Sequence, residues 1–226
     1  MLDLLYPRVC ASCRAPGRLP LCEPCDATAA WIDDACTRCA LPACDQGDQG
    51  DAGHEGGRCD GRGAAFDRAA SAGRYEGAIR DALIGFKVLG ERRAAAAMAA
   101  RMLAPLQRLA PAPDTIVTFV PSGRASMRQR GFNPAQTLAI ALAMRAGLRA
   151  LPLLRKSRET LDLAGLDRAA RRRELAGAFS PRAAAPRRIL LVDDVLTTGA
   201  TGSACAAALK EAGASAVDLV TFARAL

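Results

Sequence analysis

The sequence predicts an α/β fold, in which a doubly wound and mainly parallel sheet follows a small cysteine-rich module. Three observations predict this fold. After residue 65, strand-like apolar runs alternate with helical ones, as in βαβ units. The apolar run at residues 189–192 leads into two aspartates and a small, hydroxyl-rich loop, which is typical of the carboxyl end of a buried parallel strand. Eight of the nine cysteines precede residue 60, so a module held together by cysteines is expected at the start of the chain.

The chain has 226 residues, enough for one large core and one small appended module. We expect a cysteine-rich zinc-binding module over residues 1–62 and an α/β domain over residues 63–226, with a hinge at residues 61–64. No apolar run approaches the roughly 20 residues that a membrane span requires, and the first residues lack a basic segment and a cleavage site. A cytoplasmic protein without membrane insertion is therefore expected, while its oligomeric state is not predicted.

Apolar spacing and the positions of proline predict the elements of the α/β domain. Short apolar or extended runs predict strands at residues 65–75, 115–120, 148–154, 189–192 and 216–222. Apolar positions three or four residues apart predict helices at residues 76–89, 91–109 and 133–146. Pro111 and Pro113 end the second helix, and Asn133 caps the third with Pro134 at its first position. The polar, arginine-rich stretch at residues 155–173 is a candidate mobile lid.

The acidic pair and the loop after the strand at residues 189–192 predict a grip for a ribose 5-phosphate. Asp193 and Asp194 lie where open α/β sheets place their ligands, and carboxylates accept hydrogen bonds from vicinal hydroxyls. The loop can turn backbone N–H groups toward a phosphate at the start of the next helix; its residues are Thr197, Thr198, Gly199, Ala200 and Thr201. The alternative is an ordinary turn with helix-capping threonines and a solvated acidic pair. A Walker A loop is excluded, because it requires a lysine where Ala200 follows Gly199.

Two closely spaced C-x-x-C pairs predict a structural zinc site. The pairs are Cys10 with Cys13 and Cys22 with Cys25, and eight residues separate them. This is the ligand spacing of zinc knuckles. Disulfides are the alternative, but a chain without a secretion signal favours reduced thiolates on a metal. A redox dithiol is disfavoured because nothing resembling a βαβ unit surrounds these cysteines.

A second, less regular cluster follows. Cys36, Cys39 and Cys59, completed by either Cys44 or His54, can form a second tetrahedral zinc site. The segment is acidic, glycine-rich and short of apolar residues, so it needs a cross-link of this kind. We therefore expect one or two structural zinc ions. Cys205 lies in a predicted helix and is expected to be a small core residue.

The positive charge of the chain is concentrated in its second part. Residues 120–188 carry 15 basic residues and 4 acidic ones, against a net charge of +8 for the whole chain. Such a surface attracts polyphosphates or a nucleic-acid backbone. The alternative is a solvated surface in an arginine-rich composition, since arginine outnumbers lysine 28 to 3. The low aromatic count of nine argues against a pure base-stacking platform for single strands.

The string from Ile189 to Thr201 resembles the binding motif for 5-phosphoribosyl 1-pyrophosphate (PRPP) of the type I phosphoribosyltransferases. The whole chain resembles the ComF family, in which a cysteine-rich zinc module precedes such a domain. The residues that carry this resemblance are Cys10, Cys13, Cys22 and Cys25, Phe86-Lys87, Val120-Pro121, Arg128-x-Arg130-Gly131-Phe132-Asn133-x-x-Gln136, Arg158-x-Thr160, Arg171, Gly177-Ala178-Phe179 and the phosphate loop. Members of the family are associated with natural competence and DNA uptake, and some resemble gluconate-utilisation accessory proteins. Membership does not imply a defined reaction.

The resemblance implies a PRPP–Mg²⁺ site in which catalysis is mainly electrostatic. Asp193 and Asp194 would hold the ribose hydroxyls, directly or through the metal, and the phosphate loop would hold the 5-phosphate. Pyrophosphate would leave toward the turn that contains Pro121 and Ser122. The residues implied to neutralise it are Lys87, Arg128 and Arg130, with Arg158, Arg171 or Arg172 of the lid closing over it. The acceptor is not implied, and a non-enzymatic PRPP sensor or a single-stranded-DNA-binding factor remains an alternative.

Three departures from the family pattern concern the lid and the second zinc. Leu163 stands where the family usually has glutamine, and a usual asparagine near Glu174 is missing. The final C-x-x-C of the second cysteine cluster is replaced by Gly56-Gly57-Arg58-Cys59. We therefore expect altered lid contacts and a fourth zinc ligand drawn from Cys44 or His54.

Overall fold

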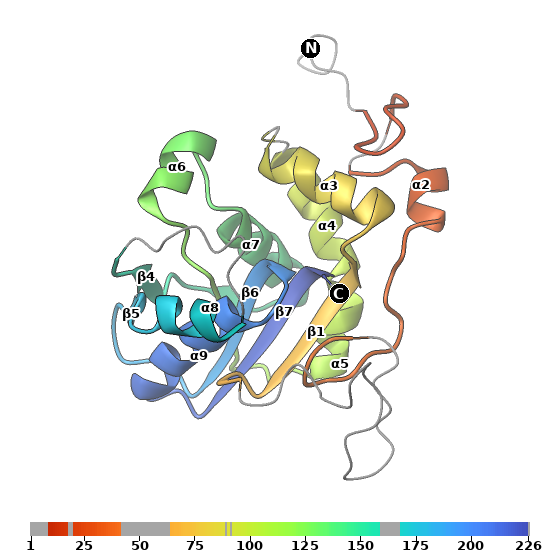
Figure 1. Ribbon diagram of the computed structural model, residues 1–226. Coiled ribbons are helices and arrows are strands. Elements are labelled where there is room, and N and C mark those ends of the chain that lie inside the picture. The colour runs from red at the N-terminus through yellow and green to blue at the C-terminus, as the bar shows by residue number, and fades with distance from the viewer. Residues whose placement is uncertain are drawn as a thin grey trace.

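The α/β domain is built on a five-stranded parallel sheet, and the predicted fold class is confirmed (Figure 1). The computed structural model describes residues 9–17, 20–41, 64–88, 90, 92–158 and 168–225. The sheet order is β1-β7-β6-β2-β3, and every neighbouring pair is parallel. The strands are β1 (Arg68–Arg74), β7 (Ala216–Arg224), β6 (Arg188–Leu196), β2 (Ile116–Phe119) and β3 (Arg149–Ala150).

The direction of the chain connections reverses between β6 and β2. From β6 the chain passes through α9 (Ala200–Glu211) to β7 on one side. From β2 it passes through α6 (Arg124–Arg130) and α7 (Pro134–Ala146) to β3 on the other side. The loops that leave the carboxyl ends of two such strands diverge and open a crevice, which is where open α/β sheets bind ligands. Residues 193–199 lie at the carboxyl end of β6, beside this reversal.

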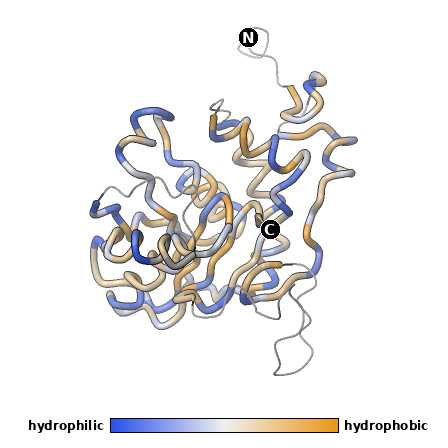
Figure 2. The backbone as a smooth tube through the Cα atoms, in the orientation of Figure 1, coloured by the Kyte–Doolittle hydropathy of each residue, from blue (hydrophilic) through white to orange (hydrophobic). Residues whose placement is uncertain are grey.

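Helices cover both faces of the sheet, as a doubly wound fold requires. Figure 1 shows α8 and α9 in front of the sheet and α4, α5 and α7 behind it. The remaining bounds are α2 (Glu23–Ala27), α3 (Gly77–Lys87), the 3₁₀ turn η1 (Arg92–Ala94), α4 (Ala95–Arg101), α5 (Leu103–Leu109) and α8 (Arg168–Leu175). Figure 2 shows that apolar residues dominate the central strands, whereas α6 is largely hydrophilic. The central strands are buried on both faces, which explains their continuous apolar runs.

Two predicted elements are interrupted, in each case near a proline. The helix predicted at residues 91–109 is divided into η1, α4 and α5, with the last break at Met102. Pro105 has no N–H to donate to the carbonyl of Arg101, so one continuous helix cannot form there. The strand predicted at residues 148–154 pairs with β2 only at Arg149–Ala150, because Pro152 cannot continue the ladder. The chain then forms β4 (Leu154–Lys156), which pairs antiparallel with β5 (Phe179–Pro181).

The cysteine-rich module lies along the edge of β1. Ile32 donates its N–H to the carbonyl of Ala72 at 2.9 Å, and Arg74 donates to the carbonyl of Ala30 at 2.8 Å. These bonds occupy part of the free edge of β1, which would otherwise be open to pairing with another chain. Buried Cys10, Leu21 and Ala40 of the module join the main hydrophobic core. The predicted boundary at residues 62 and 63 lies outside the described residues.

Among the residues that the structure describes, no helix is both long enough and apolar enough to cross a membrane.

Candidate functional site

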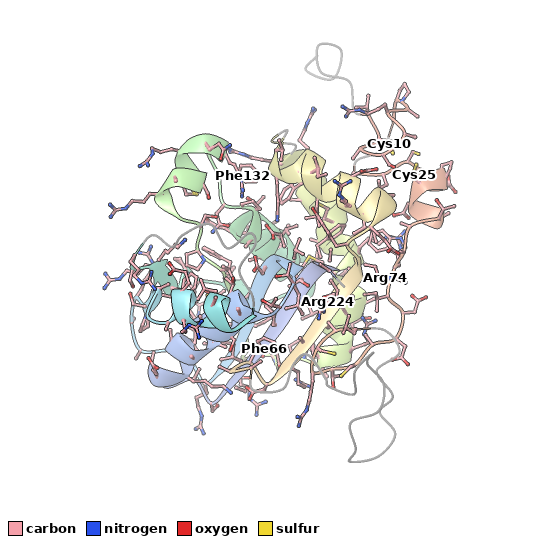
Figure 3. The ribbon with its side chains drawn as sticks, in the orientation of Figure 1. Cys10, Cys25, Phe66, Arg74, Phe132 and Arg224 are labelled. Atoms are coloured by element: carbon pink, nitrogen blue, oxygen red, sulfur yellow. The ribbon has the colours of Figure 1, made fainter. Side chains whose placement is uncertain are left out.

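The first two C-x-x-C pairs bring four sulfur atoms together. The Sγ atoms of Cys10, Cys13, Cys22 and Cys25 all lie within 4.8 Å of one another, and those of Cys13 and Cys22 are 3.5 Å apart. Tetrahedral zinc with bonds of about 2.3 Å separates its sulfur ligands by about 3.8 Å. The four cysteines therefore fit a structural zinc ion. Figure 3 shows Cys10 and Cys25 side by side near α2.

The protein backbone prepares this cluster for a cation. Burial raises the pKa of the Cys10 thiol, but N–H donors from the backbone of Cys22, Cys13 and Ser12 outweigh it and lower that pKa to about 6. Hydrogen bonding to the sulfurs of Cys22 and Cys13 raises the pKa of Cys25 to about 12. Adjacent thiols cannot all ionise without a compensating positive charge. A bound metal ion would supply that charge.

Only part of the second cysteine cluster lies in the described residues. Cys36 and Cys39 are buried, the N–H of Arg38 points to the Sγ of Cys36 at 3.4 Å, and Ala40 donates to the carbonyl of Cys36 at 2.8 Å. This turn, residues 36–41, is called the second knuckle below. The other predicted ligands, Cys44, His54 and Cys59, lie outside the described residues. The second zinc remains a prediction.

The predicted phosphate loop forms the connection from β6 to α9. Gly199 is the N-cap of α9 and has φ of +75°, a left-handed conformation that favours glycine. The hydroxyl of Thr198 accepts a hydrogen bond from the N–H of Ala200 at 3.4 Å. The first amides of a helix have no acceptor inside the helix and are aligned with the positive end of its dipole. Thr197, Gly199 and Thr201 therefore surround a position suited to an anion.

The two aspartates point to opposite faces of the sheet, because successive residues in a strand alternate. Asp194 faces α3, where its carboxylate lies 2.7 Å from the Nζ of Lys87, in the last turn of that helix. Both side chains are largely buried, with exposed fractions of 14% for Asp194 and 25% for Lys87. Lys87 was predicted to neutralise pyrophosphate. In the structure it neutralises one member of the acidic pair.

Asp193 faces the phosphate loop and α9. The residue is half-buried, but protein atoms surround its carboxyl, and this desolvation raises its pKa. The neighbouring charge of Asp194 raises it further, whereas Lys87 and the N–H of Asp194 lower it, for a net pKa of about 8. Burial also raises the pKa of the Cys205 thiol in α9, with a contribution from Asp193. Cys205 is fully buried, as expected for a core residue.

The hollow over Asp193 is small. Its volume is about 20 Å³ and its lining is Asp193, Val195, Leu196, Thr197, Gly199, Thr201, Gly202, Leu219 and Thr221. A cavity of this size holds about one water molecule, so a phosphate would bind only if the loop moved outward or on the outer side of the loop. A larger hollow, about 1030 Å³, lies between residues 20–31 and α4. None of the acidic-pair or loop residues lines it, whereas Asp193, Thr197, Gly199 and Thr201 line the smaller hollow.

The turn predicted to receive pyrophosphate lies beside the acidic pair. The N–H of Val120 donates to the carbonyl of Val192 at 3.0 Å, one residue before Asp193. Buried Asn133 holds the turn from the other side, because its Nδ2 donates to the carbonyl of Val120 at 2.9 Å. Its Oδ1 also caps α7 by accepting from the N–H of Gln136. Pro121 and Ser122 follow directly and are partly exposed.

Two motifs that the sequence separates by more than forty residues pack against each other. The rings of Phe86 and Phe132 meet edge to face with centroids 5.6 Å apart. Arg92 covers the Phe132 ring at 4.7 Å and donates to the carbonyl of Gly131 at 3.0 Å. Lys87, directly after Phe86, is thereby anchored to the region of the β2 turn. Sequence reasoning missed Arg92, since nothing in its local pattern distinguishes it from other surface arginines.

The remaining predicted basic residues are not joined to the acidic pair. Arg128 and Arg130 are exposed on α6, and within the described residues no hydrogen bond or ion pair links them to Asp193 or Asp194. Arg158 instead pairs with Glu174 at 3.1 Å. Residues 159–167 of the predicted lid lie outside the described residues, as do the side chains of Arg171 and Arg172. The described parts of the lid form β4 and α8.

Sequence reasoning also missed Arg224, the last residue of β7. It is 2% exposed, and its guanidinium donates to the carbonyl oxygens of Cys39 at 2.8 Å, Leu196 at 3.1 Å and Thr197 at 2.6 Å (Figure 3). A third bond of Nη1 goes to the carbonyl of Ala225. The signal available in the sequence was an arginine directly after the mainly apolar segment at residues 219–223, because a charge at the end of a buried strand needs internal acceptors.

The comparisons with known proteins concern mainly the N-terminal region. Residues 1–61 match the double zinc ribbon domain family. None of the curated proteins compared with the chain matches it. Among solved structures, the chain is similar to TT1426 from Thermus thermophilus, with 22% identity, a TM-score of 0.32 and coverage of 57% of this chain and 72% of that chain. The N-terminus thus carries a double zinc ribbon domain that contains the four-cysteine cluster.

Proposed function

We propose that the protein binds PRPP with Mg²⁺ at the carboxyl ends of β6 and β2, as a ComF-like, phosphoribosyltransferase-like protein. One observation carries the proposal: the reversal of chain direction between these strands gathers the acidic pair, the hydroxyl-rich loop and the turn after Val120. Each group was predicted from sequence for a different part of the same ligand. Their meeting at one edge of the sheet supports a single site.

In this proposal, each part of the ligand lies against protein groups of complementary charge or hydrogen-bonding capacity. The N-terminal amides of α9 and the hydroxyls of the loop receive the 5-phosphate. Asp193 and Asp194 receive the ribose hydroxyls. Their carboxylate oxygens are also ligands that Mg²⁺ prefers, and the ion would neutralise the pyrophosphate oxygens. Pyrophosphate then lies toward Pro121 and Ser122.

Lys87 is proposed to change partners during the reaction. Its ammonium neutralises Asp194 in the free protein and lies close enough to share its charge with an arriving pyrophosphate. In a transfer reaction, the bond from the anomeric carbon to pyrophosphate breaks, the acceptor forms its bond to that carbon and the acceptor loses a proton. A cation held beside the leaving group stabilises the charge that develops on it. The chemical identity of the acceptor is not part of this proposal.

A calorimetric titration with PRPP and Mg²⁺ tests the site. Wild type should bind, and the double variant Asp193→Asn, Asp194→Asn should bind at least about 100-fold more weakly, because the charges facing the hydroxyls and the ion are lost. Asp114→Asn is the matched control, since this exposed carboxylate lies before β2, at the opposite end of the sheet. Equal affinity of wild type and a folded double variant would overturn the assignment.

A second candidate function is single-stranded-DNA binding without catalysis. It is favoured by the 15 basic residues in residues 120–188 and by the exposed arginines of α6. The two functions predict different competition. If PRPP is the natural ligand, it should displace bound DNA, whose affinity should fall steeply with salt. Tight DNA binding that PRPP does not displace, with no pyrophosphate released for any base offered, would favour the DNA-binding function.

A further inference from the structure

The second knuckle and the phosphate loop share one buried arginine. Arg224 comes from the carboxyl end of β7, where it pairs in register with Leu196 of β6. Its Nε contacts the carbonyl of Cys39 in the knuckle, and its Nη1 contacts the carbonyls of Leu196 and Thr197 where the loop begins. A small hollow at this junction is lined by Cys39, Phe66, Leu196, Thr197, Thr198, Gly199 and Arg224. Residues far apart in sequence therefore meet around one guanidinium.

We infer that Arg224 is a positioning residue that orients the phosphate loop and ties its geometry to the second knuckle. This inference rests on the proposed function for its ligand, but the contacts do not depend on that ligand. It assigns to the cysteine module a role in anion binding at the α/β domain.

The geometry of the peptide bond determines the direction in which the N–H groups of the loop point. In a trans peptide the C=O and the following N–H point in opposite directions. When Arg224 holds the carbonyls of Leu196 and Thr197, the N–H groups of Thr197 and Thr198 must point away from the guanidinium. Those amides then belong to the outer side of the loop, where a phosphate would approach. The buried positive charge beneath the loop also favours an anion there.

The same guanidinium fixes the position of the knuckle. Besides Cys39, the knuckle has a second attachment, because the N–H of Ala69 in β1 donates to the carbonyl of Thr37 at 2.6 Å. The Cys39 carbonyl lies one bond from the Cα that carries a predicted metal-binding thiol. A change in the fold of the knuckle therefore moves an acceptor of Arg224 directly. Only an arginine offers donors fixed in one plane for acceptors on both sides; a lysine has one nitrogen for all of them.

Arg224→Lys and Arg224→Met test the inference in two ways. Without any ligand, hydrogen exchange at residues 196–201 should be faster than in wild type. With PRPP–Mg²⁺ or inorganic phosphate as the probe, affinity should fall about tenfold in Arg224→Lys and further in Arg224→Met, in line with the loss of hydrogen bonds to a charged donor. Arg68→Lys is the matched control, because Arg68 has a comparable set of bonds to Asp218 and Leu109 at the opposite end of the sheet. It should lower stability and leave loop exchange and affinity unchanged.

A double-mutant cycle tests the link to the knuckle. Cys36→Ser, Cys39→Ser should also accelerate exchange at residues 196–201, and it should add little in the Arg224→Met background, since the connection is already broken. Additive effects of the cysteine and Arg224 substitutions on hydrogen exchange at residues 196–201 would overturn the proposed link between the knuckle and the loop. Loop exchange and phosphate affinity equal to wild type in Arg224→Lys would overturn the positioning role. If wild type binds neither PRPP nor phosphate, the proposed function fails. The hydrogen-exchange measurements, which need no ligand, still test whether Arg224 positions the loop.

Discussion

The cysteine module and the α/β domain are ordered by different forces. In the domain, β6, β7 and α7 bury most of their apolar side chains in one core, and this burial stabilises the sheet. In the described part of the module, Cys36, Cys39 and Leu41 form a small apolar cluster, and Cys10, Leu21 and Ala40 are buried only by joining the core of the domain. The described part of the module therefore has little core of its own and packs against the domain, whereas the strands and helices of the domain supply most of the main core.

The contacts between the two regions reach the proposed ligand site. Ser12, between the first cysteines, donates to the carboxylate of Asp81 in α3 at 2.8 Å, and Ala11 packs near Gly85 of the same helix. That helix ends at Lys87, the partner of Asp194. On the other side, Arg224 joins the second knuckle to the phosphate loop. Two separate described parts of the module, residues 11–12 and the second knuckle, thus contact elements that carry residues of the proposed site.

The largest expected effect is that of losing the first zinc. Metal analysis should give at least one zinc per chain, and two if the second cluster also binds. In Cys10→Ser, Cys22→Ser the binding free energy, about 10–16 kcal/mol in zinc-finger peptides, is no longer available to order the module. Amide exchange should then become fast over residues 10–25 while β6 and β7 remain protected. Zinc-free wild type with four titratable thiols and an ordered module would contradict this comparison.

An intermediate effect is expected at the junction itself. A Cβ on Gly73 of β1 would lie 3.0 Å from the carbonyl of Ala30 and 3.2 Å from the Trp31 ring, and would overlap the Ile79 side chain. Gly73→Ala should therefore cost about 1–3 kcal/mol through overpacking, measured as a lower midpoint in urea. Exchange at residues 30–32 should rise more than exchange in β6, because the module segment is the one that can move. Gly177→Ala is the comparison, since a Cβ there meets nothing within 4 Å, although its φ of +65° adds backbone strain.

The sequence predicted the sheet because its strands are buried on both faces and read as apolar runs without any tertiary information. The acidic pair and the phosphate loop were predicted for a similar reason, since all their residues are consecutive. Arg92 was missed because its acceptor lies 39 residues away, and Arg224 because its acceptors in the loop and the knuckle lie 27, 28 and 185 residues away; the spacing of apolar residues does not encode such contacts. The partner of Lys87 was missed for the same reason, since it forms across 107 residues of sequence. Proline positions explain the helix break at Met102 and the short β3, so both differences from the predicted elements could have been predicted from the sequence.

The smallest expected effect concerns Asp193 and depends on pH. Its folded-state pKa is raised to about 8, above the roughly 3.9 of an unfolded aspartate, so between these values the folded protein binds more protons. The stability that Asp193 contributes is fully present below about pH 4 and is lost as the pH rises toward 8. An asparagine side chain cannot ionise, so Asp193→Asn should remove this loss. Thermal unfolding of both proteins without PRPP and Mg²⁺ should show midpoints that are close at about pH 4, with the midpoint of the variant higher at about pH 8.5. Parallel pH profiles for the two proteins would show that the loop and α9 do not desolvate the carboxyl of Asp193.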